Sequence, residues 1–189
     1  MRSSAVILAV FASLVGAGST CAGVIAYGYP YASRCPGAGL AEQVDRWKMY
    51  TCNCTSYAAW ALSVNGQRTD WFIPGSMDAQ NWAHVARLRG IPVGKAPRVG
   101  AVAVWPRLSE FGHVAYVTRL EPGGGFDVAE YNLPAIGAED SFAFDVRRDV
   151  RRAGAVFIYV PKKAYRKTRT SETARPPRRP PSRNAWLPT

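Results

Sequence analysis

Cys54 stands at the expected start of a helix in this 189-residue chain and is the first residue whose type and position suggest chemistry. The good helix formers Ala58, Ala59, Ala61 and Leu62 follow it, and small polar residues of the kind that cap helix N-termini surround it. A thiol in the first helical turn lies near unpaired backbone N–H groups and the positive end of the helix dipole, which favour the thiolate. Cys54 is therefore a candidate nucleophile, and the alternatives at this point are a buried structural cysteine or one half of a disulfide.

A cysteine nucleophile needs a base, and the chain contains two histidines. His84 lies off the apolar stripe of an expected helix, which indicates a solvated side chain. His113 begins an otherwise apolar strand directly after Gly112, a residue that lets another backbone or a substrate approach closely. We expect His113 to be the base.

The base must be oriented by a third group, and two polar residues on the next expected strand are candidates. Glu130 and Asn132 are two positions apart, so on a strand both side chains point to one face and can reach a histidine on the neighbouring strand. An acid within an apolar strand is costly unless it is paired. The spacing therefore predicts that Glu130 and Asn132 support His113.

The surrounding elements fall into helices followed by strands. One helix follows Cys54, and a second, capped by Ser76, is expected to bury the face that bears Trp82. A Pro-Gly-rich turn at 122–125 separates two of four apolar segments. These segments are residues 101–105, 114–118, 126–131 and 155–160. Helices followed by a meander predict an α+β domain in which N-terminal helices pack on a small antiparallel sheet.

The cysteine count favours one disulfide and one free thiol, because three cysteines, Cys35, Cys52 and Cys54, follow residues 1–22, which are expected to be removed as a signal peptide. Cys52 and Cys54 are too close in sequence for an easy mutual bridge, so Cys35 is expected to pair with one of them. The helix-mouth position of Cys54 favours the Cys35–Cys52 pair. A zinc site made of Cys52, Cys54, His84 and His113 is disfavoured because no second ligand cluster stands at finger spacing, and no metal or cofactor is predicted.

The chain divides into three expected parts. Residues 1–22 have the basic start, the apolar run and the small residues of a secretory signal peptide. Lipidation at Cys21 is disfavoured because no large aliphatic residue stands three positions before it. Residues 23–160 form one domain that begins with an irregular arm, and the basic, Pro-rich residues 161–189 cannot bury a core and are expected to be disordered.

The positive charge is concentrated in this tail. The chain has 24 Lys and Arg against 13 Asp and Glu, a formal net charge of +11. Nine of the basic residues and one acid lie in residues 161–189, and Arg2 lies in residues 1–22, which leaves fourteen basic and twelve acidic residues in the domain. The charge pattern favours tethering to an anionic surface polymer over nucleic-acid binding, for which the domain shows no aromatic-basic platform.

Four segments together resemble the CHAP domain, the cysteine- and histidine-dependent amidohydrolases and peptidases of bacterial and phage cell-wall lysis. They occur in the family's order at residues 53–60, 97–105, 112–117 and 128–132, and the resemblance covers roughly residues 27–160. The likeness implies a papain-like α+β fold. By that likeness Cys54 is the nucleophile, His113 the base, Glu130 the acid that orients the base and Asn132 a further polar support.

The resemblance also implies a substrate and a location. It suggests a secreted, periplasmic or cell-wall-associated hydrolase that cleaves an amide bond of peptidoglycan through a thioester. Both the link between muramic acid and L-alanine and the bonds of the peptide stem or cross-bridge fit this expectation, and a catalytically idle wall-binding module is the alternative. We expect a monomer with no nucleic-acid partner and no stable membrane insertion after signal cleavage.

Overall fold

The computed structural model describes residues 24–35, 43–73, 75, 78–133, 142–151 and 153–164. The expected signal peptide with Cys21, the expected cap at Ser76 and the tail beyond residue 164 lie outside these ranges. Among the described residues, no helix has the length and apolar character needed to cross a membrane.

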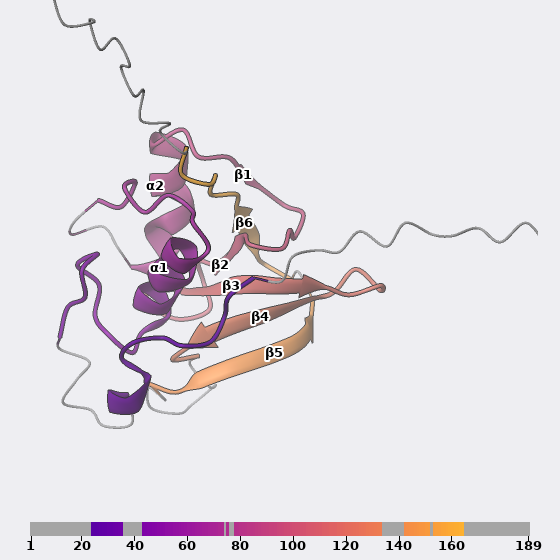
Figure 1. Ribbon diagram of the computed structural model, residues 1–189. Helices are drawn as coiled ribbons and strands as arrows, with labels where there is room; N and C mark the ends of the chain where they lie inside the picture. Colours follow the sequence, from indigo (N-terminus) through magenta and orange to yellow (C-terminus); the bar gives the residue numbers. More distant parts are fainter. Residues whose placement is uncertain are drawn as a thin grey trace, which may run out of the picture.

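Two α-helices precede one antiparallel sheet in the described chain, as expected for the α+β class (Figure 1). The helical elements are η1 (Ala32–Arg34), α1 (Cys54–Val64), η3 (Ala79–Asn81) and α2 (Trp82–Leu88). The strands are β1 (Val93–Gly94), β2 (Val102–Trp105), β3 (His113–Leu120), β4 (Phe126–Tyr131), β5 (Phe144–Val150) and β6 (Val156–Ile158). Their order in the sheet is β1-β6-β2-β3-β4-β5, so the last strand is inserted beside β2 rather than added at an edge.

Helix α1 packs on the sheet and is buried on nearly all sides. Tyr57, Ala58, Ala59, Ala61 and Leu62 are fully buried. The small alanines let the helix lie close to β3 and β4, which it contacts. On another side the arm covers it, because the ring of Tyr29 packs against Tyr57 with centroids 5.7 Å apart. A helix covered from several sides needs no polar face, which explains its nearly uniform apolar sequence.

The side chains of the central strands alternate between two hydrophobic clusters, one on each face of the sheet. The cluster shared with α1 contains Val102, Val104, Val114, Tyr116, Ala129 and Tyr131. The opposite cluster contains Ala101, Ala103, Trp105, Ala115, Val117, Phe126, Val128 and Phe157. By this alternation His113 shares a side of β3 with Ala115, and Glu130 shares a side of β4 with Val128.

The folded part of the chain extends slightly beyond the predicted boundary at residue 160. The backbone N–H of Arg68 donates to the carbonyl of Pro161 at 3.0 Å, and that of Lys163 donates to the carbonyl of Gly66 at 2.8 Å. These bonds flank a bridge between Gln67 and Lys162. Residues 161–164 therefore belong to the domain rather than to the tail.

Candidate active site

Cys54 occupies the first position of α1, with Asn53 as the N-cap residue. The first helical hydrogen bond runs from the N–H of Tyr57 to the carbonyl of Asn53 at 3.1 Å, so the amides before it lie outside the helical ladder. The side chain of Asn53 makes no capping bond. Its Oδ1 instead accepts a hydrogen bond from Nδ2 of Asn132 at 2.8 Å. The N-terminus of α1, beside the thiol, therefore has no side-chain cap.

The thiol lies in the wall of a cleft of about 760 Å³. Cys54 is 9% exposed, so a ligand in the cleft can reach it while most of its surface is covered. The loop 43–50 and the segment 109–112 contribute most of the remaining walls. The other lining residues are Val44, Lys48, Met49, Tyr50, Asn53, Thr55, Gly75, Asp78, Ala79, Ser109, Glu110, Phe111, Gly112 and Asn132. A cleft of this size suits an extended organic ligand.

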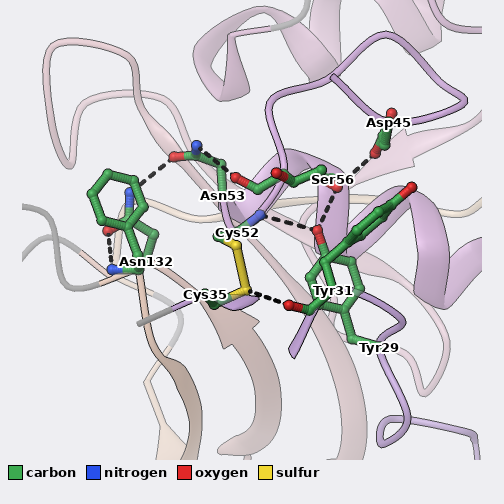
Figure 2. The surroundings of a disulfide bond; sticks show 10 residues. Tyr29, Tyr31, Cys35, Asp45, Cys52, Asn53, Ser56 and Asn132 are labelled. Atoms are coloured by element: carbon green, nitrogen blue, oxygen red, sulfur yellow. Dashed lines mark hydrogen bonds between the residues drawn. A yellow bond between two sulfur atoms is a disulfide. The ribbon is translucent and has the colours of Figure 1, made fainter. Parts of the chain in front are cut away.

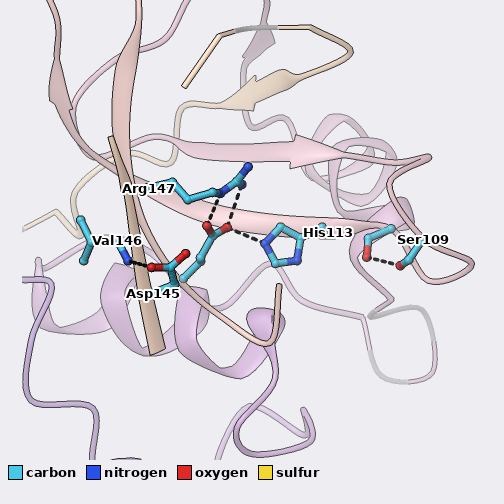
Figure 3. A network of polar contacts seen from close by, with 7 residues as sticks. Ser109, His113, Asp145, Val146 and Arg147 are labelled. Atoms are coloured by element: carbon cyan, nitrogen blue, oxygen red, sulfur yellow. Dashed lines mark hydrogen bonds and ion pairs between the residues drawn. The ribbon is translucent and has the colours of Figure 1, made fainter. Parts of the chain in front are cut away.

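The backbone around His113 is fixed by a close approach. Gly112 has a φ of +73°, and a Cβ added there would lie 2.6 Å from the backbone nitrogen of Gln80 in η3. Glycine is needed at this position, which confirms the close approach predicted from the sequence. The hydroxyl of Ser109 donates to the carbonyl of Gly112 at 2.9 Å (Figure 3). The residue before His113 is thus held from two sides.

His113 and Glu130 form a fully buried pair, as predicted. Nε2 of His113 lies 2.6 Å from Oε2 of Glu130. Burial lowers the pKa of His113, but the charge and hydrogen-bonding interactions with Cys54 and Glu130 outweigh it and raise the pKa to about 9. Nδ1 makes no hydrogen bond of ordinary geometry in the described part of the chain. Since Nε2 is engaged by Glu130, Nδ1 is the nitrogen left for the thiol.

Arg147 is a third, half-buried member of this group that the sequence analysis missed. Its Nη2 donates to Oε2 of Glu130 at 2.9 Å, and its Nε donates to Oε1. Burial raises the pKa of Glu130, but hydrogen bonds from His113 and Arg147 overcome that effect and hold the pKa below its ordinary value. The signal that could have found Arg147 is the acid itself, because a buried carboxylate in an apolar strand requires a cation or several donors.

Asn132 does not support His113 directly, and this part of the prediction was wrong. Strand β4 ends at Tyr131, and Asn132 has a φ of +49°, so the alternation of faces stops one residue before it. Its Nδ2 bonds to Asn53, and its Oδ1 accepts from the N–H of Phe142 at 3.0 Å (Figure 2). Asn132 therefore positions the residue that precedes the thiol rather than the imidazole.

The predicted disulfide is present. Cys35 and Cys52 are bonded, with Cα atoms 5.3 Å apart and a sequence separation of 17, and Cys54 is a free cysteine. Because Cys52 is in the disulfide, the zinc site considered from the sequence lacks one of its ligands. The bridge ties the arm to the residue two positions before the nucleophile.

A chain of oriented hydrogen bonds extends from Cys52 into the core (Figure 2). The N–H of Cys52 donates to the hydroxyl of Tyr29 at 3.1 Å. The hydroxyl of Ser56 donates to the buried carboxylate of Asp45 at 2.6 Å, so the contact of 2.6 Å between the two hydroxyls is donated by Tyr29. Each donor has one acceptor in this chain, which fixes the backbone that leads into α1.

Comparison with known proteins gives a family match and two curated relatives. The CHAP domain family matches residues 44–132. A probable autolysin of Staphylococcus aureus is 32% identical over 91 residues, which are 47% of this chain and 30% of the autolysin. A putative hydrolase of Streptococcus mutans is 38% identical over 63 residues, which are 33% of this chain and 28% of that protein. This chain therefore spans less than a third of the length of these relatives.

A solved structure is also similar. The crystal structure of an N-acetylmuramoyl-L-alanine amidase from Staphylococcus aureus aligns with a TM-score of 0.49 at 21% sequence identity, over 59% of this chain and 31% of that chain. The family match contains the cysteine, the histidine, the glutamate and the asparagine described above. The region that carries these four residues is therefore similar to the CHAP domain family.

Proposed function

We propose that this chain is a peptidoglycan hydrolase that cleaves an amide bond of the cell wall with Cys54 as its nucleophile. The match of residues 44–132 to the CHAP domain family supports this function, as do relatives described as an autolysin and a hydrolase. The observation that carries the proposal is the buried His113–Glu130 pair, which leaves one ring nitrogen for a thiol in the wall of a cleft.

The proposed reaction uses Cys54 as the nucleophile and His113 as the base and acid in turn. Nδ1 of His113 takes the proton of Cys54, and the thiolate attacks the amide carbonyl. The first amides of α1 stabilise the oxyanion, because no side chain caps them. His113 then protonates the leaving amine, and water hydrolyses the thioester with His113 as the base. Glu130 holds the imidazole in the required orientation throughout.

The proposal includes a papain-like arrangement, in which the nucleophile on a helix faces a base on the sheet. Contacts of α1 with β3 and β4 support this arrangement. Asn132 contributes by holding the side-chain oxygen of Asn53, which would otherwise be free to cap the amides that bind the oxyanion.

We also propose that the protein acts outside the cytoplasm, where peptidoglycan lies. The signal-like residues 1–22 and the Cys35–Cys52 disulfide support this location, since disulfides persist in oxidising compartments. The basic residues 161–189 support binding to anionic polymers of the cell surface. We propose that the protein works as a monomer.

Zymography on purified cell walls tests the function. Wild-type protein should clear the wall, whereas Cys54→Ser and His113→Ala should lose at least 1,000-fold in rate, on the order found when a nucleophile or base is removed. His84→Ala is the matched control, because His84 is exposed on α2 and should keep full activity. Mass spectrometry of the released fragments would identify the bond.

Two outcomes would contradict the proposal. Full clearing by Cys54→Ser would refute the cysteine mechanism. Binding of the wild-type protein to walls without release of any fragment would favour the catalytically idle wall-binding module.

A further inference from the structure

Four adjacent strands each contribute one side chain to a connected group at the site. They are Trp105 on β2, His113 on β3, Glu130 on β4 and Arg147 on β5. Trp105 lies opposite His113 in the β2–β3 register, and their ring centroids are 6.2 Å apart. The guanidinium carbon of Arg147 lies 5.1 Å from the ring centroid of Trp105. The indole therefore contacts both groups that bond to Glu130.

The Glu130 carboxylate is held by both of its oxygens. Oε2 accepts hydrogen bonds from Nε2 of His113 at 2.6 Å and from Nη2 of Arg147 at 2.9 Å, while Oε1 accepts one from Nε of Arg147. Figure 3 shows His113 and Arg147 reaching this one carboxylate from different strands. A carboxylate bonded to a histidine alone can rotate about its terminal torsion, whereas a guanidinium that bonds both oxygens fixes its plane.

We propose that Arg147 is a positioning residue, which fixes the Glu130 carboxylate against Nε2 of His113 and thereby fixes the ring nitrogen that faces Cys54. Its side chain is 28% exposed and leans on Trp105, while Glu130 is fully buried. The orienting acid of the site is thus itself oriented from β5. The consequence for catalysis rests on the proposed function, but the geometry and its effect on His113 do not.

A purely structural role is the alternative reading of this contact. Arg147 also joins β5 to β4, so its loss could weaken the sheet without touching the chemistry. The two roles differ in what they do to His113. If Arg147 has only a structural role, replacing it changes the free energy of unfolding alone. If it is a positioning residue, replacing it also changes the titration of His113 and the turnover of the site.

The charge of Arg147 predicts the direction of the titration effect. Glu130 is faced by His113 from β3, by Arg147 from β5 and by Tyr57 from α1, while Cys54 of α1 faces His113. Without the guanidinium, the buried carboxylate is compensated by protonated His113 alone. The proton shared by that pair is then held more tightly, so its apparent pKa should rise by about one unit or more.

Nuclear magnetic resonance of the full-length chain measures this effect without a substrate. The chain has two histidines, and the exposed His84 serves as an internal reference. We expect the apparent pKa of His113 to rise in Arg147→Met and to stay at the wild-type value in Arg147→Lys, which keeps the charge. Arg148→Met is the matched control, because Arg148 is the next residue on β5, is 74% exposed and faces Asp127 instead.

Kinetics on cell walls give the second readout. Arg147→Lys keeps the charge but loses the paired hydrogen bonds from the guanidinium to both carboxylate oxygens of Glu130. We therefore expect kcat to fall about tenfold with KM unchanged. Arg147→Met should show the same loss and an alkaline limb of kcat/KM that is moved to higher pH. Arg148→Met should match the wild type in both parameters.

Each outcome decides the proposal. An unchanged His113 titration in a folded Arg147→Met protein would overturn it, as would wild-type kcat in Arg147→Lys. If Arg147→Met does not fold, the Lys variant decides, and failure of both to fold would make Arg147 a structural strut. If the wild type releases nothing from walls, the proposed function fails, while the His113 titration still decides the role of Arg147.

Discussion

Replacing Gly112 by alanine tests how tightly the backbone beside His113 is held. The new Cβ would lie 2.6 Å from the backbone nitrogen and 2.9 Å from the Cα of Gln80. Both contacts are with main-chain atoms, which cannot rotate away as a flexible side chain can. Either η3 or the segment 109–112 must therefore move.

The expected loss of stability has two parts. Gly112 has a φ of +73°, and the left-handed region costs a non-glycine residue about 1–2 kcal/mol. The overlap with Gln80 adds a cost of the kind found on overpacking, about 1–3 kcal/mol. We therefore expect Gly112→Ala to lower the free energy of unfolding by about 3 kcal/mol. A displacement of His113 by about 1 Å would also lower turnover by about 100-fold.

Gly124 provides the matched control, because it shares the strained backbone without the close contact. Its φ is +81°, and a Cβ added there would meet no atom within 4 Å. It lies in the turn between β3 and β4, at the end of β3 remote from His113. Gly124→Ala should lower the free energy of unfolding by about 1 kcal/mol and leave wall hydrolysis unchanged.

Urea denaturation and zymography measure the two effects. Asparagine tolerates the left-handed region, so Gly124→Asn should regain most of the lost stability, whereas Gly112→Asn should not, because its Cβ meets the same backbone. Equal losses of stability at the two glycines, together with full hydrolysis by Gly112→Ala, would refute the reasoning.

Three further predictions follow from the disulfide, the buried pair and the domain boundary. The double variant Cys35→Ala/Cys52→Ala should lose about 3 kcal/mol in urea, as loop entropy gives for a separation of 17, and a reducing agent should destabilise only the wild type. The pKa of His113 is raised to about 9, so its contribution to stability is complete below the unfolded value of 6.5 and is lost as pH rises through about 9. The free energy of unfolding should therefore be lower near pH 10 than near pH 6, and Glu130→Gln should make this difference smaller. Truncation after Ala164 should spare the fold and hydrolysis of a soluble muropeptide but weaken action on intact walls at low salt, and equal wall activity with and without the tail would exclude the tether.

The sequence predicted the parts of the fold where burial is continuous. Every residue of β2 and β4 is buried, and such apolar runs identify strands without knowledge of their neighbours. Strand β5 was not predicted, because charged residues interrupt its apolar residues and its residues are half-buried or exposed. Strand β1 is too short, at two residues, to leave a pattern.

The site was predicted to the extent that it depends on single residues and strand order. His113 and Glu130 come together because β3 and β4 are neighbours, which the short turn between them already indicated. Arg147 could not be placed without β5, and Asn132 was misassigned because the end of β4 cannot be located to one residue from a pattern. The positions of Arg147 and Asn132 depend on tertiary contacts, which a sequence pattern does not show.

The two outer strands of the described sheet have a consequence for how the molecule behaves among its own copies. A free strand edge is a template on which another chain can add a strand. Here β1 offers two residues, and β5 carries the exposed charges of Arg148 and Asp149, the latter in a left-handed conformation that interrupts regular pairing. A second copy that paired with β5 would have to desolvate these charges, so the sheet resists edge-to-edge aggregation.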